Sequence, residues 1–403
     1  MIKQFRVQNY KALRDVTLNL TPIHVLIGPN DSGKTSLLEA IAALCRSTGV
    51  PIADAFLGQW DGRALVNERG VFSTSVTLSA NFDVPDFRYT LECRFPPSGK
   101  NCEIVDEQWG NHSARSLEDH SASFVFRHCI KGETGELFRW AVPKEELKTW
   151  VAGLRAVHQL LAGAGYYRLT PKVLALPAAP DSRRGFSLEV SGFGLARYLD
   201  ELLGQDRERF AALERGFTRL FPSVRSIKLI PESGFRTVPD SPHQVPVLGK
   251  AEGKGLSFEM NGGLMVNASQ SSDGMLLVLA YLALLHSPTP PRVLLIEEPE
   301  NGIHPKRLQE VLAILRQLVS EQQHTQIILT THSPYVLDSF QPEEVTLCHK
   351  NESGEVSVRR LSESKTVREQ IDIFSLGEIW TAAGDEDLAI PVDSAAVVEE
   401  VAP

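Results

Sequence analysis

The sequence lacks several features of membrane, secreted and fibrous proteins. No apolar stretch among its 403 residues approaches the roughly 20 residues of a membrane span, and the N-terminus has no signal-peptide layout. The five cysteines are scattered and never spaced as C-x-x-C, which is typical of free thiols in a reducing compartment. There is no internal repeat and no long heptad array, which excludes a long coiled coil. We therefore expect a cytoplasmic protein without a membrane partner.

Basic residues are missing from the C-terminal part of the chain. Nine of the 50 acidic residues follow Arg368, where no Lys or Arg occurs, and this leaves 41 acids against 41 bases before that point. The whole negative balance therefore belongs to the tail. Such a tail is either a solvated end or a docking segment for a basic partner.

A phosphate-binding loop is the most informative feature that is present. Its pattern is G-x-x-x-x-G-K-[ST], and its residues are Gly28, Pro29, Asn30, Asp31, Ser32, Gly33, Lys34 and Thr35. The apolar run before it predicts a buried strand, and residues 36–44 predict a helix after it. In such a loop the backbone N–H groups bind phosphate, the lysine reaches the β- and γ-phosphates, and the threonine can hold Mg²⁺. The sequence therefore predicts binding of a nucleoside triphosphate.

A second acidic motif follows the apolar run at residues 293–296. Glu297 and Glu298 come directly after these four strand-like residues, which is the layout of a Walker B strand. The first acid would reach Mg²⁺, and the second would orient or deprotonate the attacking water. On its own the pattern also fits an acidic helix cap after a core strand. The phosphate-binding loop upstream favours the nucleotide interpretation.

Two more segments fit a nucleotide site. His332 ends another apolar, strand-like run at residues 327–331, where it could contact the γ-phosphate, although a lone histidine there is usually structural. Ser272, Asp273 and Gly274 directly precede an apolar helix at residues 275–285. A Ser and a Gly at a helix N-terminus can bind an anion, but they are equally an ordinary helix cap.

Periodicity divides the chain into four segments. Residues 1–95 predict strands, the phosphate-binding loop and a β-meander over residues 72–95. Residues 96–245 predict an insertion of short strands followed by helices at 144–161 and 195–220, with Gly/Pro-rich breaks around 173–186 and 232–256. Residues 246–350 hold the second half of the nucleotide motifs, and residues 351–403 form an acidic extension.

The order of these motifs resembles the ABC-type ATPases of the OLD, RecF and SMC group, often labelled AAA-family ATP-binding proteins. The resemblance rests on the phosphate-binding loop, the Ser-Asp-Gly segment and the runs Ile-Glu-Glu-Pro-Glu-Asn-Gly-Ile-His-Pro and Thr-Thr-His-Ser-Pro. The opening strands and the segments at 166–171 and 192–195 also resemble that group. The implied fold is an α/β ATPase head with a mixed central sheet, an antiparallel β-subdomain and a helical insertion.

The resemblance implies a role for each motif. Residues Gly28 to Ser36 would be Walker A, and Ser272 to Gly274 would be the signature segment that meets the nucleotide of a second subunit. Glu297 would be the Mg²⁺-side acid together with Thr35, Glu298 the catalytic acid, and His332 the switch histidine. Residues 300–304 would form the D-loop. ATP, Mg²⁺ and a homodimer or higher oligomer formed through the ATP sites are thereby implied.

The sequence also departs from the group. Asp31 stands where many members have Gly, and Met275 follows the signature where a polar residue is usual. Neither Gln59 nor Gln108 has a context that marks it as the Q-loop glutamine. OLD nucleases carry a Toprim nuclease domain, but roughly 70 residues follow His332 and they contain no D-x-D strand. We therefore expect a separate effector rather than a Toprim nuclease within this chain.

These expectations favour an ATP-dependent switch in a DNA-related process, such as the ATPase of an anti-phage system with a separately encoded effector. A RecF-like repair ATPase that acts without an effector is the main alternative, while the ATP-binding subunit of a transporter and a small-molecule kinase fit less well. One basic segment could face DNA. Its residues are Arg155, Arg168, Lys172, Arg183 and Arg184.

Overall fold

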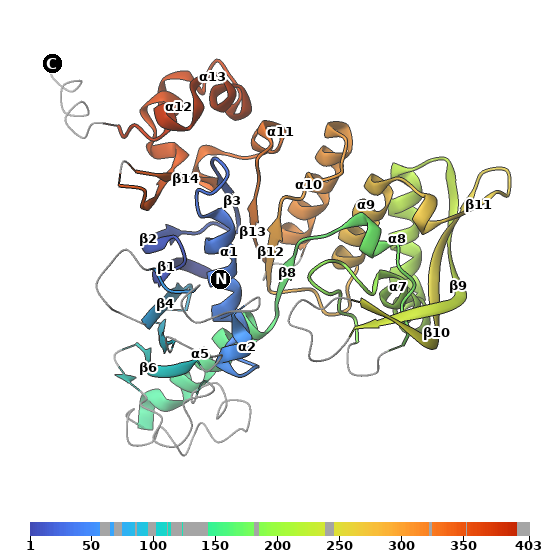
Figure 1. Ribbon diagram of the computed structural model, residues 1–403, viewed down its shortest axis with the longest axis horizontal. Helices are drawn as coiled ribbons and strands as arrows, with labels where there is room; N and C mark the ends of the chain where they lie inside the picture. Colours follow the sequence, from blue (N-terminus) through green and yellow to red (C-terminus); the bar gives the residue numbers. More distant parts are fainter. Residues whose placement is uncertain are drawn as a thin grey trace. The chain divides into compact units, whose positions relative to one another are not determined.

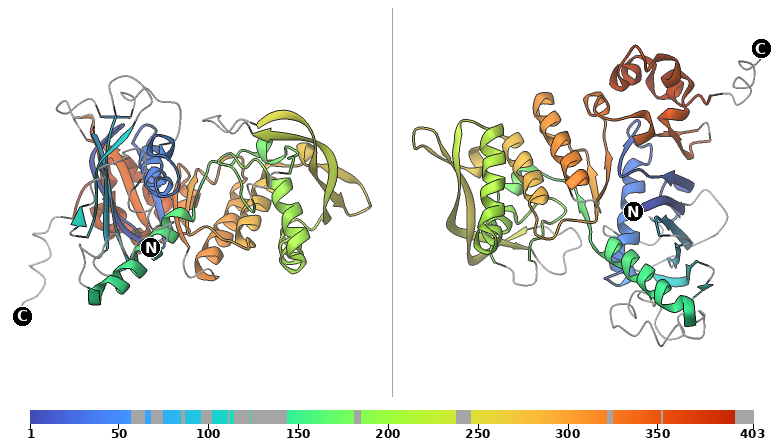
Figure 2. Two further views of the ribbon diagram at one scale, coloured as in Figure 1. Left: turned by 90° about the horizontal axis from the view of Figure 1, so that it is seen from below. Right: turned by 180° about the vertical axis from the view of Figure 1, so that it is seen from behind.

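The computed structural model contains two compact units (Figures 1 and 2). Met1–Ala164 and Gln326–Pro403 form the first unit, and Gly165–Thr325 forms the second. The four sequence segments predicted above stay a prediction, since these units follow spatial contacts. The structure describes residues 1–56, 65–67, 75–84, 87–95, 102–110, 112–113, 123, 144–180, 185–237, 246–321, 325–351 and 353–392.

An antiparallel sheet in the first unit confirms the predicted β-subdomain. Its strand order is β2-β1-β4-β5-β6-β7. The bounds are β1 Ile2–Tyr10, β2 Leu13–Asn19, β4 Ser75–Phe82, β5 Arg88–Arg94, β6 Glu103–Trp109 and β7 His112–Ser113. Alternation sends Phe5 and Val7 of β1 into the core, where both are 0% exposed. The meander predicted over 72–95 is present from Ser75 onward, and residues 72–74 lie outside the described residues.

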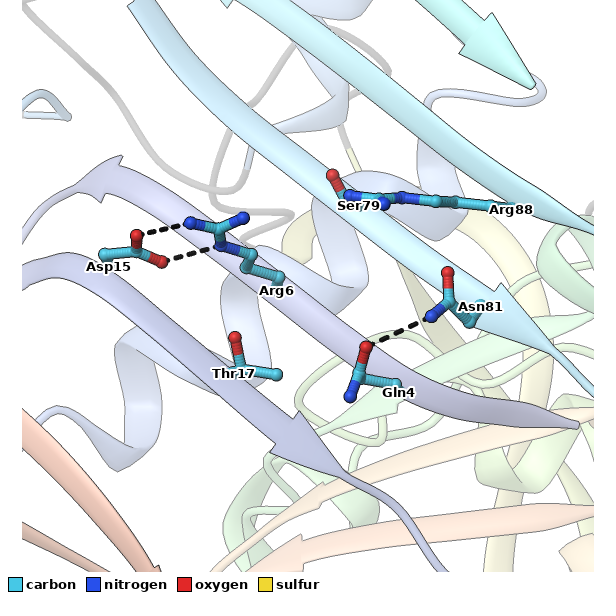
Figure 3. A pocket seen from close by; sticks show the side chains of 7 residues that line it. All are labelled: Gln4, Arg6, Asp15, Thr17, Ser79, Asn81 and Arg88. Atoms are coloured by element: carbon cyan, nitrogen blue, oxygen red, sulfur yellow. Dashed lines mark hydrogen bonds and ion pairs between the residues drawn. The ribbon is translucent and has the colours of Figure 1, made fainter. Parts of the chain in front are cut away.

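The outer face of this sheet is polar, as expected of an antiparallel sheet with one face on the core. A pocket of about 430 Å³ opens on this face, and Figure 3 shows the side chains that line it. The Arg6 guanidinium donates from Nε and Nη2 to Asp15 at 2.8 and 2.6 Å, and these hydrogen bonds lower the pKa of the Asp15 carboxyl. The Asn81 amide donates to Gln4 at 3.1 Å. The pocket is lined by Gln4, Arg6, Asp15, Thr17, Ser79, Asn81 and Arg88.

A second sheet in the first unit carries the phosphate-binding loop. Strand β3 (Ile23–Ile27) is entirely buried and pairs in parallel with β13 (Gln326–Thr330) and β14 (Val345–Lys350). Strand β15 (Val356–Arg360) then pairs antiparallel with β14, which makes the sheet mixed, as predicted. Helix α1 (Lys34–Arg46) packs against β1, β4 and β13, so it lies between the two sheets. This explains why most of its residues are buried.

The remaining helices of the first unit frame these sheets. Helix α5 (Lys144–Ala162) matches the predicted helix at 144–161 and packs on α1. Beyond residue 351, α12 (Lys365–Gln370) and α13 (Leu376–Leu388) fold back, with Leu376, Ile379 and Leu388 buried. The acidic segment is therefore folded through residue 392 of the described chain. Short helices α2 (Ile52–Ala55) and α11 (Pro334–Leu337) complete the unit.

The second unit packs helices on a three-stranded sheet of order β11-β10-β9. Helices α7 and α8 lie along the curved β9–β10 hairpin (Figure 1). The helical periodicity predicted over 195–220 is confirmed by two helices that meet at Asp206, whose carboxylate caps α8 by accepting from Arg209 N. The bounds are β8 Ala164–Tyr167, α6 Pro171–Leu174, α7 Leu195–Gln205, α8 Arg207–Leu220, β9 Val224–Thr237, β10 Pro246–Met260, β11 Met265–Asn267, α9 Asp273–Leu285, β12 Val293–Glu297 and α10 Pro305–Glu321.

The break predicted at 232–256 was wrong, because β9 and β10 run through most of it. Glycine is required at two of these positions because a neighbouring backbone segment leaves no room for a side chain. A Cβ at Gly253 would lie 2.7 Å from Ala178 O, and one at Gly234 would lie 2.7 Å from Ala179 N. The backbone at Ala178 crosses the hairpin closely and exchanges two hydrogen bonds of 3.0 Å with Lys254. These glycines thus mark a close backbone approach within a sheet.

Candidate nucleotide-binding and hydrolysis site

The phosphate-binding loop follows β3 and depends on two glycines. Gly28 has a φ of +133°, and a Cβ there would lie 2.0 Å from Cys348 O of the neighbouring strand β14. Gly33 has a φ of +92°, and a Cβ there would lie 2.9 Å from Val356 Cγ2. Other residues at either position would meet both strain and a clash. The loop is therefore shaped by the backbone and its close neighbours.

Lys34 occupies the centre of this loop. Its ammonium group donates to Gly28 O at 2.9 Å, to Pro29 O at 2.7 Å and to Ser32 Oγ at 3.3 Å, and the residue is 5% exposed. Thr35 and Ser36 follow in the first turn of α1, which contains no acidic residue. A buried cation, a hydroxyl donor and the N-terminus of a 13-residue helix together suit a chain of phosphates.

Asp31 has a partner outside the loop. It adopts a φ of +66°, which Asp tolerates better than most residues, and its side chain is 84% exposed. Lys350, the last residue of β14, forms an ion pair with its carboxylate. The negative charge introduced at this position is thus balanced by a lysine that sequence reasoning did not single out.

His332 lies at the same sheet edge as the loop. Strand β13 is parallel to β3 in the register Thr330↔Leu26, and the following Thr331 N donates to Leu26 O at 3.1 Å. Carboxyl ends of parallel strands meet at one edge, so the half-buried His332 and the loop leave the sheet side by side. The structure therefore brings together the two sequence-predicted motifs of the first unit.

In the second unit, Glu297 ends the fully buried strand β12 and is 5% exposed. Both of its carboxylate oxygens are occupied. Tyr166 Oη donates to Oε1 at 2.8 Å, and Arg168 Nε lies 3.3 Å from Oε2. The sequence indicated Tyr166 only through the family resemblance, and Arg168 also as part of the basic segment, so neither contact with Glu297 was predicted. The signal that could have revealed them is their period-2 spacing on a strand.

Glu298 adopts an unusual backbone conformation directly after the strand. Its φ is +44°, which costs a residue with a side chain about 1 to 3 kcal/mol. Asn301 Nδ2 donates to its Oε2, and Asn301 N donates to its carbonyl oxygen at 3.0 Å. Such strain is typical of functional sites, where the surrounding turn holds a side chain in one direction.

The signature segment begins α9. Ser272 Oγ accepts a long hydrogen bond of 3.4 Å from Met275 N, and Ser272 and Asp273 are exposed. From Leu276 to Leu285 the helix is entirely buried. Gly302 of the predicted D-loop lies beside the segment, since a Cβ there would be 3.6 Å from Asp273 Cβ. The second unit therefore brings its signature and D-loop residues together.

The residues of the predicted basic segment are divided between the two units. Arg155 belongs to the first unit, whereas Arg168 and Lys172 belong to the second, and Arg168 is paired with Glu297. Arg183 and Arg184 lie outside the described residues. A DNA-facing role for the segment stays a prediction, and Arg168 has a partner that the prediction did not foresee.

The oxygen donors fit Mg²⁺ better than a metal held by protein alone. Across the described ranges, no group of three or more His, Cys, Asp or Glu side chains could hold a metal ion. Mg²⁺ usually binds to one or two protein oxygens and to the phosphates and waters of its substrate. The Thr35 hydroxyl and the Glu297 carboxylate suit that mode. In the described part of the chain, no helix is long and apolar enough to cross a membrane.

Two family models match the chain. One, described as "AAA domain, putative AbiEii toxin, Type IV TA system", matches residues 180–338, and the other, "AAA ATPase domain", matches residues 1–129. An OLD nuclease of Thermus scotoductus is 24% identical over 417 residues, which cover 96% of this chain and 70% of the relative. An SMC head solved with the winged-helix domain of ScpA is 13% identical with a TM-score of 0.52, covering 89% of this chain and 98% of that one.

The loop, the buried acid and the fold define a P-loop ATPase. The two AAA models match the chain, an OLD nuclease is a relative and the SMC head shares the fold, so the chain is similar to AAA ATPases of the OLD- and SMC-like type. The family resemblance, the fold class and the ATPase activity predicted from the sequence are thereby confirmed.

Proposed function

We propose that this ATPase is a nucleotide-dependent switch that dimerises around ATP and acts in a DNA-related process. Lys34 donates to the β- and γ-phosphate oxygens, His332 contacts the γ-phosphate, and Glu298 accepts the proton of the attacking water. General-base help of this kind contributes about 10² to 10⁴ in rate. Thr35 and Glu297 would hold Mg²⁺, which would supply charge stabilisation of the phosphates. Glu298 suits its role because its strained backbone and Asn301 orient its carboxylate.

The exposed start of α9 is the observation that carries the dimer. Ser272 and Asp273 are exposed at the end of a helix that is otherwise buried. The only hydrogen bond of the Ser272 hydroxyl among the described residues is its long bond to Met275 N. A free N-terminal turn of this kind suits an anion presented from outside, such as the γ-phosphate of a nucleotide bound to a second copy.

Trapping the dimer tests the proposal. Glu298→Gln should retain ATP binding, lose about 10² to 10⁴ in turnover and shift to a dimer in ATP, measured by light scattering on a sizing column. Glu208→Gln removes an exposed carboxylate of α8 and should behave as wild type. Retained turnover in Glu298→Gln would show that Glu298 is not the general base. A variant that stays monomeric in the presence of ATP would contradict the proposed ATP-dependent dimer.

The proposal also includes the process in which the ATPase acts, which we infer to be DNA-related. An OLD nuclease is among the relatives, and this supports a DNA-related process. Within that process we infer a separately encoded effector, as in an anti-phage system, with a repair ATPase that acts alone as the alternative. We place the protein in the cytoplasm because Cys45, Cys93, Cys102 and Cys348 are free and buried.

DNA retention tests this part. Changing Arg183 and Arg184 to Glu should weaken DNA retention at low salt. Unchanged retention would show that these residues do not contact DNA. ATP hydrolysis that is stimulated by DNA ends without any partner protein would favour the repair alternative.

A further inference from the structure

The carboxylate of Glu297 is held by two donors of different kinds. Tyr166 contributes a neutral hydroxyl at 2.8 Å from Oε1, and Arg168 contributes a cation at 3.3 Å from Oε2. The Glu297 side chain is 4% exposed, while that of Arg168 is 67% exposed. A buried carboxylate is costly without partners, so both contacts stabilise its charge.

The fold explains why these two donors meet one acid. Strands β8 (Ala164–Tyr167) and β12 are hydrogen-bonded neighbours in one sheet. Tyr166 and Arg168 are two residues apart, so their side chains face the same way. The intervening Tyr167 points to the opposite face, and its side chain is buried. Arg168 N donates to Val190 O at 2.8 Å, which holds the backbone just beyond the strand.

The two donors differ in how they respond to a cation. A neutral hydroxyl can keep its hydrogen bond to Oε1 while a metal ion approaches Oε2. A guanidinium cannot share Oε2 with a divalent cation, because the two positive charges repel each other at short range. The head group of Arg168 is largely solvated, so leaving Glu297 costs it little.

We propose that Tyr166 is a positioning residue for the Walker B acid and that Arg168 is a displaceable counterion that competes with the divalent cation. Tyr166 orients Glu297 in both states, whereas Arg168 neutralises it only until the metal binds. This inference rests on the proposed function of Glu297 as the Mg²⁺-side acid. It predicts effects of opposite sign for two neighbouring residues on the same acid.

Titrating the full-length protein with Mn²⁺ tests this in the presence of a non-hydrolysable ATP analogue, with free Mn²⁺ read by electron paramagnetic resonance. Tyr166→Phe should weaken Mn²⁺ binding about tenfold, since a hydrogen bond to a charged group is lost. Arg168→Gln should strengthen it about threefold, as expected from removing a weak competing ion pair. Tyr167→Phe and Lys172→Gln are matched controls that remove a neighbouring hydroxyl and a neighbouring exposed cation, and neither should change binding.

Thermal unfolding in EDTA gives a second readout that needs no activity. Both Tyr166→Phe and Arg168→Gln should lower the melting temperature without metal, and Mg²⁺ with the analogue should restore only Arg168→Gln to wild type. If both variants weaken Mn²⁺ binding, Arg168 is not a competitor. If neither changes binding while Glu297→Gln does, the inference is overturned and the role of Glu297 stands. If Glu297→Gln binds Mn²⁺ as wild type, the proposed role of Glu297 fails as well.

Discussion

The two halves of the nucleotide machinery are built by different means. In the first unit the phosphate-binding loop is shaped by backbone clearance, with Gly28 pressed against Cys348 O and Gly33 against Val356. In the second unit Glu297 is placed by side chains, through Tyr166 and Arg168. In the proposed function the first half binds a phosphate chain through backbone N–H groups, and the second half positions single carboxylates.

This difference affects how each half tolerates mutation. A clearance of 2.0 Å at Gly28 leaves no room for any side chain, so the loop should respond to substitution in an all-or-none manner. A carboxylate held by one hydrogen bond and one ion pair should respond in graded steps, because each partner contributes separately. The predictions that follow test the first half, from the largest expected effect to the smallest.

Gly28→Ala should cause the largest loss. The added Cβ meets Cys348 O and requires a φ of +133° of an L residue, which together should cost about 3 kcal/mol in unfolding free energy. ATP binding should fall below detection in calorimetry. Gly49→Ala is the matched control, since a Cβ at that position would have no neighbour within 4 Å and the φ there is ordinary. A Gly28→Ala chain that binds ATP normally would contradict a backbone-shaped loop.

His24 should make the first unit sensitive to acid. It is buried in β3, with Nδ1 3.1 Å from Thr21 Oγ1 and Nε2 3.0 Å from Thr346 Oγ1. Burial, and then the charge of Arg360, lower the pKa of His24 to about 3. The unfolded chain, with an ordinary pKa near 6.5, therefore binds more protons between pH 6.5 and pH 3. Stability is lost as the pH falls through that window, by up to about 1.4 kcal/mol per pH unit.

Replacing His24 measures how much this residue contributes to the pH dependence of the unfolding free energy. His24→Gln should flatten the dependence of unfolding free energy on pH between 6.5 and 4.5 in urea titrations. At pH 7.5 the variant is expected to be less stable than wild type, because the buried polar pair is disturbed. Equal slopes for the two proteins would mean that other groups dominate acid unfolding.

Lys350→Gln should have the smallest effect. The Asp31–Lys350 pair is largely exposed, and exposed pairs contribute little. Loss of the lysine leaves the Asp31 carboxylate beside the phosphate chain, and we expect ATP affinity to fall about twofold to fivefold at low salt. The double change Asp31→Asn with Lys350→Gln should recover most of the loss. A defect in the double variant as large as in Lys350→Gln would show that Lys350 acts on its own.

The same contrast explains what could be predicted from the sequence. The phosphate-binding loop, β3, α1 and the Glu297-Glu298 pair were all predicted, because glycine spacing and apolar runs are local signals. The helical periodicity over 195–220 was also predicted, but the division into two helices at Asp206 was not, since the cap lies within an unbroken apolar stripe.

Long-range partners had no local signal. The glycines at 234 and 253 indicated a break in secondary structure. In the structure they leave room for the backbone at Ala178, which lies more than 50 residues away in the sequence. The Tyr166 and Arg168 contacts with Glu297 join residues about 130 positions apart, and Lys350 reaches Asp31 across 319 positions. Pairing of this kind depends on strand order, which periodicity does not specify.

Complementation between two inactive chains tests the central claim most directly. Lys34→Ala removes the phosphate lysine, and Ser272→Arg blocks the exposed turn at the start of α9. Each variant alone should be inactive, but an equal mixture should regain about a quarter of wild-type ATP hydrolysis, because half of the dimers contain one site built from two intact surfaces. A mixture as inactive as its components, or full hydrolysis by Ser272→Arg alone, would contradict an ATP site shared between two copies.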